Sequence, residues 1–175
     1  MTTIAATLPT STAPAPAAVS PLRAQAARWL LATSDDGGAL LARLALALVF
    51  FPHGAQKVLG WFGGYGFSGT LAFMNGTLGI PTPLAVVAIL TEFLAPLALL
   101  VGAGSRLAAA GIAAIMVVAT LTVHLPHGFF MNWSGAQQGE GFEYHLLALA
   151  LALVVVVRGG GRWAVDQAAA RRLSV

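Results

Sequence analysis

Four long apolar runs restrict the folds that are open to this sequence. They lie at residues 39–59, 82–101, 106–125 and 142–157, and glycine, proline and polar residues separate them. A helix rises 1.5 Å per residue, so about 20 residues cross the hydrocarbon core of a bilayer. Inside that core every backbone polar group needs an internal partner, which a helix provides. The sequence therefore predicts an all-α membrane protein: a four-transmembrane-helix bundle surrounded by the lipid bilayer.

The composition supports the membrane assignment and excludes several other classes. Hydrophobic residues make up 58% of the 175 residues and charged residues only 9%, whereas globular proteins average about 25% charged residues. Nine basic residues beside apolar runs are too few for a nucleic-acid-binding surface, so no nucleic acid partner is expected. The chain has no cysteine, which excludes disulfides, thiol catalysis, iron–sulfur clusters and cysteine-bound zinc.

The two ends of the chain differ from its centre. Residues 1–38 are predicted to form a disordered tail, rich in Ala, Pro, Thr and Ser, followed by a short interfacial helix that contains Arg28 and Trp29. Residues 39–158 form the predicted membrane domain. Residues 159–175 form a basic tail.

The basic residues predict the orientation in the membrane. Four spans place both termini on one side, and that side receives eight arginines, whereas the other receives only Lys57. Cytoplasmic segments are enriched in basic residues, so both termini are predicted to be cytoplasmic. Arg43 and Lys57 lie near the two ends of the first span, where their long side chains are expected to reach the interface. The terminal side has Arg23, Arg28, Arg43, Arg106, Arg158, Arg162, Arg171 and Arg172.

Polar residues within the spans gather in the middle and outer part of the predicted bundle. A charge in hydrocarbon costs several kcal/mol, so such groups normally face one another or a wet cavity. The sequence therefore predicts a site in the outer half, closed by the loop between the third and fourth spans. The polar residues at this depth are His53, Lys57, Glu92, His124, Glu143 and His145.

The loop supplies further candidate ligand-binding residues. Phe129, Phe130 and Trp133 are either aromatic residues of the membrane interface or the lining of a site for a flat ligand, and Asn132 offers a hydrogen bond. Glu143 and His145 are two residues apart and cannot share a helical face. We expect His145 to point inward and Glu143 to point towards the loop or a partner.

Each ionisable candidate has a structural and a functional interpretation. Glu92 either forms an ion pair with Lys57 or Arg106, or accepts protons and orients a ligand. Lys57 is either an interfacial anchor or part of the site. The histidines either form interfacial hydrogen bonds, relay protons, hold a quinone carbonyl, or bind haem or a metal. The chain has no Glu-x-x-His or His-x-x-x-His motif, so metal and haem are less favoured than a quinone.

Several of these residues resemble the DoxX family of small bacterial membrane proteins. The matching features are Arg43, Gly54 and Lys57 in the first span, Glu92 in the second, and Arg106 at the start of the third. The most specific features are two motifs, Gly-Phe-Phe-Met-Asn-Trp at 128–133 and Gly-Glu-Gly-Phe-Glu-Tyr-His at 139–145. The resemblance covers residues 40–158.

The resemblance implies a subunit of the bacterial cytoplasmic membrane linked to quinone- or quinol-coupled respiratory or detoxifying redox. Whether it has turnover of its own stays open; as an enzyme it would be an oxidoreductase subunit. The candidate catalytic residues are Glu92, Lys57, His124 and His145, and the candidate quinone-binding residues are His53, Phe129, Phe130, Asn132, Trp133 and Glu143. The alternatives are a non-catalytic anchor for a soluble redox or sulfur enzyme, and a small-molecule carrier, which mid-membrane Glu92 beside Pro96 would suit. Possible protein partners are a redox protein or further copies of the chain.

Overall fold

A computed structural model describes residues 21–173, and within this range the chain folds into helices with no strand. The predicted disordered segment at residues 1–20 lies outside the described residues. The four long helices are α2 (Gly37–Leu59), α4 (Thr82–Val101), α5 (Ser105–Ala119) and α6 (Glu143–Arg158). Three shorter α-helices are α1 (Pro21–Leu31), α3 (Gly66–Gly76) and α7 (Val165–Leu173).

Within residues 21–173, three helical segments are long and apolar enough to cross a membrane. These are Gly37–Leu59, Thr82–Val101 and Ser105–His127. The third combines α5 with a π-helical turn, η2 (Thr120–His124), and a 3-10 turn, η3 (Leu125–His127). A further 3-10 turn, η1 (Trp61–Gly63), follows α2. Helix α6 has 16 residues, fewer than the roughly 20 that a straight span needs.

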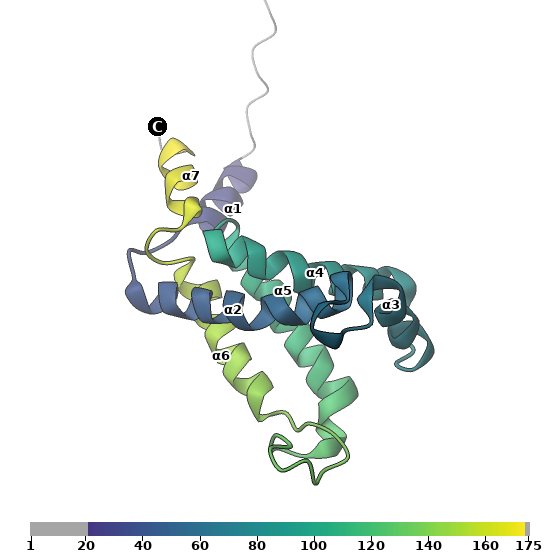
Figure 1. Ribbon diagram of the computed structural model, residues 1–175. Helices are drawn as coiled ribbons and strands as arrows, with labels where there is room; N and C mark the ends of the chain where they lie inside the picture. Colours follow the sequence, from purple (N-terminus) through teal and green to yellow (C-terminus); the bar gives the residue numbers. More distant parts are fainter. Residues whose placement is uncertain (1–20, 174–175) are drawn as a thin grey trace, which may run out of the picture.

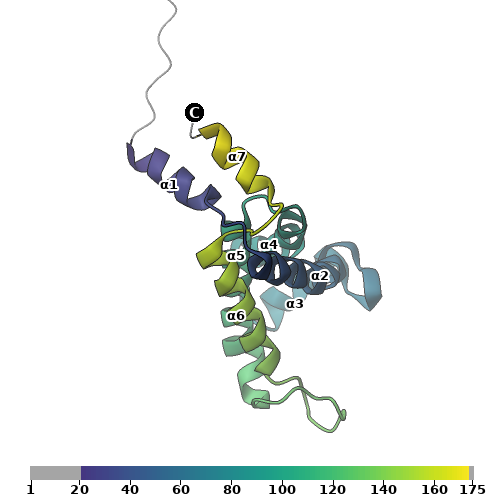
Figure 2. The same ribbon diagram turned by 90° about the vertical axis from the view of Figure 1, so that its left-hand side faces the viewer.

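The long helices diverge from one end of the molecule. Helices α2 and α4 pack side by side, and this pair reaches α3 at its far end (Figure 1). Helices α5 and α6 pack together, and the loop at residues 128–142 joins their far ends. Helices α1 and α7 lie together at the end where the two pairs meet (Figure 2). The two pairs therefore form the arms of a V, and contacts between α4 and α5 and between α2 and α6 join them.

The α2–α4 pair packs closely because Gly54 has no side chain. A Cβ atom at Gly54 would lie only 2.4 Å from the carbonyl oxygen of Glu92 and 2.5 Å from Phe93 Cα. Pro96 has no N–H group, so it cannot supply the usual helical hydrogen bond to the Glu92 carbonyl. The glycine thus lets α2 approach α4 at the place where α4 has a free carbonyl group.

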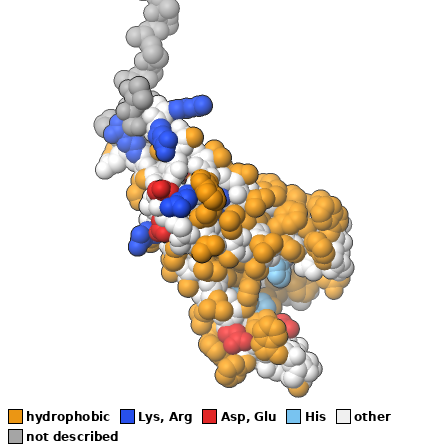
Figure 3. All heavy atoms as spheres, turned by 60° about the vertical axis from the view of Figure 1, so that its left-hand side comes forward, with side chains coloured by type: hydrophobic (Ala, Val, Ile, Leu, Met, Phe, Trp, Pro, Cys, Tyr) orange, Lys and Arg blue, Asp and Glu red, His pale blue; other side chains and the backbone are white. Residues whose placement is uncertain are grey.

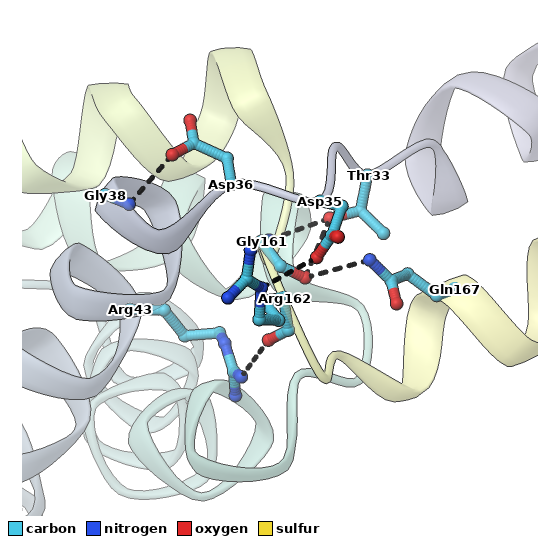
Figure 4. Close-up of polar contacts among 8 residues, drawn as sticks. All are labelled: Thr33, Asp35, Asp36, Gly38, Arg43, Gly161, Arg162 and Gln167. Atoms are coloured by element: carbon cyan, nitrogen blue, oxygen red, sulfur yellow. Dashed lines mark hydrogen bonds and ion pairs between the residues drawn. The ribbon is translucent and has the colours of Figure 1, made fainter.

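A buried arginine joins the helices where the arms meet (Figure 4). Arg43 is only 2% exposed, and its guanidinium donates to the carbonyl oxygens of Leu99 at 2.6 Å, Leu100 at 2.9 Å and Gly160 at 2.8 Å. Figure 4 shows a further bond from the same guanidinium to the Arg162 carbonyl oxygen, at 3.3 Å. The last carbonyl groups of a helix lack partners within it, and the forked guanidinium satisfies several of them together. The expectation that Arg43 reaches the interface is therefore wrong: its side chain points into the protein.

Two more buried charges stabilise the same end. Asp166 of α7 accepts hydrogen bonds from the backbone N–H groups of Gly104 at 2.7 Å and Ser105 at 2.9 Å, where α5 begins. A carboxylate at a helix N-terminus satisfies free donors and complements the helix dipole. Arg106 donates to the carbonyl oxygens of Ala32 and Val156, and its guanidinium lies 4.6 Å from the Trp29 ring centroid. These contacts hold α1, α5, α6 and α7 together.

The surface separates into a charged end and an apolar body. Arginine side chains gather around the end where α1 and α7 lie, and hydrophobic side chains cover most of the rest of the face in view (Figure 3). Leu48, Leu107 and Leu147 are each at least 68% exposed. Such a surface suits contact with lipid chains and not with water.

Candidate functional site

A large cavity lies between the two arms of the V. Its volume is about 820 Å³, and α4 and α5 contribute more lining residues than any other helix, while α2, α3, α6 and the loops complete the walls. Figure 3 shows histidine side chains in the hollow between the arms. Most lining residues are apolar, and the polar side chains in the walls are His53, Lys57, Thr70, Thr91, Glu92, Thr122, His124, Glu140, Tyr144 and His145.

An ion pair occupies one wall of the cavity. The Lys57 ammonium group of α2 donates to a Glu92 carboxylate oxygen of α4. The Glu92 side chain is 7% exposed and that of Lys57 is 29% exposed, so the carboxylate is the more deeply buried partner. Removing one partner of such a pair leaves an uncompensated charge, which costs about 3–5 kcal/mol in a fully buried pair. The pair therefore holds an ammonium group and a carboxylate in place on an otherwise apolar wall of the cavity.

Two histidine rings lie in contact, tilted by 45° to each other, at the end of the cavity beside the 128–142 loop. The ring centroids of His124 and His145 are 4.1 Å apart. His124 comes from the π-helical turn, in which the Leu125 N–H bonds to the Thr120 carbonyl five residues earlier. Such a turn rotates the following side chains relative to a regular α-helix, and π-turns are frequent at functional sites. His145 comes from the first turn of α6 and is 5% exposed.

Tyr144 extends this cluster towards α2. Its ring centroid is 6.4 Å from that of His53 and 5.5 Å from that of His145. The Tyr144 hydroxyl and His145 Nδ1 are both buried, and none of the described residues offers either atom a hydrogen-bond partner. A buried polar group left without a partner costs about 1–3 kcal/mol. Both residues line the cavity, so these two buried atoms are candidates for hydrogen bonds to a ligand.

The candidate residues of the loop lie outside the cavity wall. Glu143 points towards the loop, as its spacing from His145 predicted, and a carboxylate oxygen accepts from the Met131 N–H at 2.9 Å and the Trp133 indole N–H at 3.4 Å. Asn132 closes the loop through Gln137, donating to its carbonyl at 3.0 Å and accepting from its N–H at 2.9 Å. None of the predicted loop candidates lines the cavity wall: this holds for Phe129, Phe130, Asn132, Trp133 and Glu143.

The aromatic loop residues pack against one another or face outward. The ring centroid of Phe129 lies 5.1 Å from that of Phe130 and 5.5 Å from that of Phe142. Trp133 is 87% exposed. The loop thus caps the ends of α5 and α6. The five remaining candidates, His53, Lys57, Glu92, His124 and His145, all line the cavity.

The histidines do not assemble a metal centre in the described part of the chain. Within residues 21–173 no group of three His, Asp or Glu side chains is placed to hold a metal ion. His124 Nδ1 instead hydrogen-bonds to the Glu140 carbonyl oxygen at 2.8 Å. A carbonyl oxygen only accepts, so His124 Nδ1 bears the proton and donates it in this bond.

Sequence reasoning missed Tyr144 as a site residue. It directly precedes His145, so an inward-facing His145 would place Tyr144 about 100° around a regular helix, away from the same face. The cavity nevertheless reaches both residues because they lie at the very start of α6. The position of Tyr144 beside two other polar residues, Glu143 and His145, was the signal that could have identified it.

Comparisons with known proteins agree with the membrane fold. The sequence model of the DoxX family matches residues 38–125. A protein of Bacillus subtilis (strain 168), named "Putative oxidoreductase CatD", is 28% identical over 122 residues, which cover 70% of this chain and 81% of that protein. No solved structure matches the chain significantly.

Proposed function

Because the chain belongs to the DoxX family, we propose that it is a redox-linked membrane subunit that binds a quinone or quinol in the cavity between α4 and α5. The observation that supports this most directly is an apolar cavity with a few unpartnered polar atoms on its wall. The oxidoreductase name of the Bacillus subtilis relative points to the same class of chemistry. The chain has no cysteine, so an oxidoreductase partner would supply or accept the electrons.

The size and the lining of the cavity fit such a ligand. A volume of about 820 Å³ lies within the roughly 300–1,000 Å³ of typical small-molecule sites. Leucine, valine, alanine and isoleucine side chains of α4 and α5 suit a flat ring and the first part of an apolar tail. The arms of the V are lipid-facing helices in this proposal, so the ligand enters from the bilayer.

The polar groups fit a ring with oxygen atoms at opposite edges. The Tyr144 hydroxyl and His145 Nδ1 lie in the α6 wall, and the Lys57–Glu92 pair lies in the wall formed by α2 and α4. A quinone presents two acceptors and a quinol presents two hydroxyl groups. Donors and acceptors on both sides can therefore hold either form and orient its ring.

We place both termini in the cytoplasm and let α6 cross the membrane as a fourth span. Helix α6 begins beside the loop at 128–142 and ends beside Ser34, whose N–H donates to the Arg158 carbonyl at 3.2 Å. It therefore runs the full length of α5 between the same two ends. The polar first turn of α6 faces the cavity and the loop. Lipid therefore has to cover only the apolar remainder of the helix.

Binding of a short-tailed benzoquinone to the purified protein in lipid nanodiscs tests this proposal by calorimetric titration. Ala114 lines the cavity, so Ala114→Trp fills it and should abolish binding. Leu107 on the same helix is 70% exposed, so Leu107→Trp is the matched control and should bind normally. The proposal fails if the wild-type protein does not bind the quinone, or if both variants bind it equally.

A second pair of variants tests the hydrogen bond from α6. The chain has two tyrosines, and Tyr65 is 83% exposed and lies outside the cavity. Tyr144→Phe should weaken quinone binding by about 2- to 12-fold, because one hydrogen bond contributes about 0.5–1.5 kcal/mol. Tyr65→Phe should leave the affinity unchanged. Equal affinities of the two variants would remove Tyr144 from the site.

A further inference from the structure

We propose that His145 and His124 form a proton path that connects the ligand in the cavity with water at the 128–142 loop. This inference rests on the proposed function, since it concerns an ionisable ligand in the same cavity. His145 is the inner member, because it is 5% exposed and its buried Nδ1 has no hydrogen-bond partner among residues 21–173. His124 is the outer member, because it is partly exposed and bonds to the loop.

The hydrogen bond to the loop sets the direction of the path. His124 Nδ1 donates to the Glu140 carbonyl oxygen, so in the neutral ring Nε2 is the free acceptor. The two rings lie in contact, with 4.1 Å between their centroids. A proton on His145 therefore has an acceptor beside it, His124 Nε2. The other nitrogen of that ring, Nδ1, is held by its hydrogen bond to the loop.

The steps move protons only. A ligand hydroxyl gives its proton to His145 Nδ1, so the ligand O–H bond breaks and an N–H bond forms. His145 then passes a proton to His124 Nε2, and His124 releases it to water beside the loop. The reverse sequence delivers a proton to a ligand oxygen. Two imidazolium rings this close would repel each other, so the pair holds one excess proton at a time.

Other titratable groups face the histidine pair from the surrounding elements, and they are possible competitors for the proton. Glu92 is engaged by Lys57, and Glu140 uses its carboxylate to accept from the Asn132 N–H at 2.7 Å. His127 is set apart, because its ring packs against Gly139 of the loop and does not line the cavity. The groups around the pair are His53 and Lys57 of α2, Glu92 of α4, Tyr144 of α6, and Glu140 of the loop.

Proton uptake on binding of an acidic ligand tests the path. The probe is an alkylated hydroxynaphthoquinone, which is an anion in neutral water. Calorimetric titration of the full-length protein in buffers of different ionisation enthalpy gives the number of protons taken up per ligand. The wild-type protein should take up about one proton, since a histidine is the group that most readily accepts one near neutral pH. His145→Gln and His124→Gln should each reduce the number of protons taken up per bound probe to near zero. His145→Gln should also weaken binding of the probe, because His145 Nδ1 is one of the proposed ligand contacts.

His127→Gln is the matched control and should keep the uptake of the wild type. Binding of the probe without proton uptake would refute the path and leave the quinone site standing. Failure of the wild-type protein to bind either the probe or a benzoquinone would refute the proposed function itself. Should His127→Gln abolish uptake as well, the proton would come from a group outside the pair.

Nitrogen NMR of the ligand-free protein supplies a test that does not depend on binding. The chain has only four histidines, so each signal can be assigned by substitution. His124 should be in the tautomer with the proton on Nδ1, as its bond to the Glu140 carbonyl requires. A proton on His124 Nε2 in the neutral ring would contradict the proposed direction of transfer.

Discussion

Lys57 and Glu92 form an ion pair that joins α2 to α4 on the wall of the cavity. The pair lies near Gly54, three residues before Lys57, and the Glu92 backbone itself packs against that glycine. The same residue of α4 thus contacts α2 through both its backbone and its side chain. The interface between α2 and α4 is therefore part of the candidate site. A change that weakens this interface should also weaken ligand binding in the cavity.

The first prediction concerns this ion pair. Glu92→Gln and Lys57→Gln should each lower the free energy of unfolding by about 1–3 kcal/mol, between the values for exposed and buried pairs, because Lys57 is partly exposed. The double variant should lose less than the sum of the two. A double-mutant cycle in detergent, followed by denaturant unfolding, measures the coupling. The more exposed pair Arg158–Asp36 is the control, and its coupling should stay below about 1 kcal/mol.

The second prediction concerns the close approach at Gly54. Gly54→Ala places a methyl group 2.4 Å from the Glu92 carbonyl oxygen, so α2 and α4 must separate. We expect a loss of about 1–3 kcal/mol in stability, as for overpacked cores, together with weaker quinone binding. Gly37→Ala in the same helix is the control, because a Cβ there meets nothing within 4 Å. Equal melting temperatures of the two variants would rule out the tight contact.

The third prediction concerns Arg43. Arg43→Lys keeps the charge but replaces the forked guanidinium with a single ammonium group, so some of the carbonyls of Leu99, Leu100 and Gly160 lose their donor. We expect a loss of about 2–3 kcal/mol, because buried carbonyl groups without partners are costly. Thermal unfolding measures it. Arg172 in the last turn of α7 is exposed, so Arg172→Lys should change stability by less than about 0.5 kcal/mol.

The fourth prediction concerns membrane topology. The arginine-rich end formed by α1 and α7 should lie in the cytoplasm, because basic segments are retained there. An enzyme reporter that works only outside the cytoplasm should be inactive when fused after Val175 and active when fused after Gly135 in the loop. Activity of the fusion after Val175 would place the termini on the opposite side.

The helical segments themselves could be predicted from the sequence. The apolar runs, bounded by glycine and proline, led to predicted helices at 82–101 and 142–157, and α4 spans Thr82–Val101 while α6 spans Glu143–Arg158. Backbone groups in an apolar setting must bond within their own helix, so local composition is enough to locate a helix. The depth of the polar residues along the spans could also be predicted, because the position of a residue along a helix follows from its number and the constant rise.

Only the tertiary structure decided which of these residues meet. The inward position of His145 and the position of Glu143 towards the loop were predicted from their spacing and are confirmed. The packing of the helices alone decided that Tyr144 lines the same cavity and that the His124 ring lies against the His145 ring. Arg43 was expected at the interface and is instead buried among carbonyl groups of α4 and of the segment after α6. Helical periodicity determines which residues of one helix share a face, but the packing of the other helices determines what that face meets. The V-shaped divergence of the helix pairs, and with it the cavity, arises from that packing.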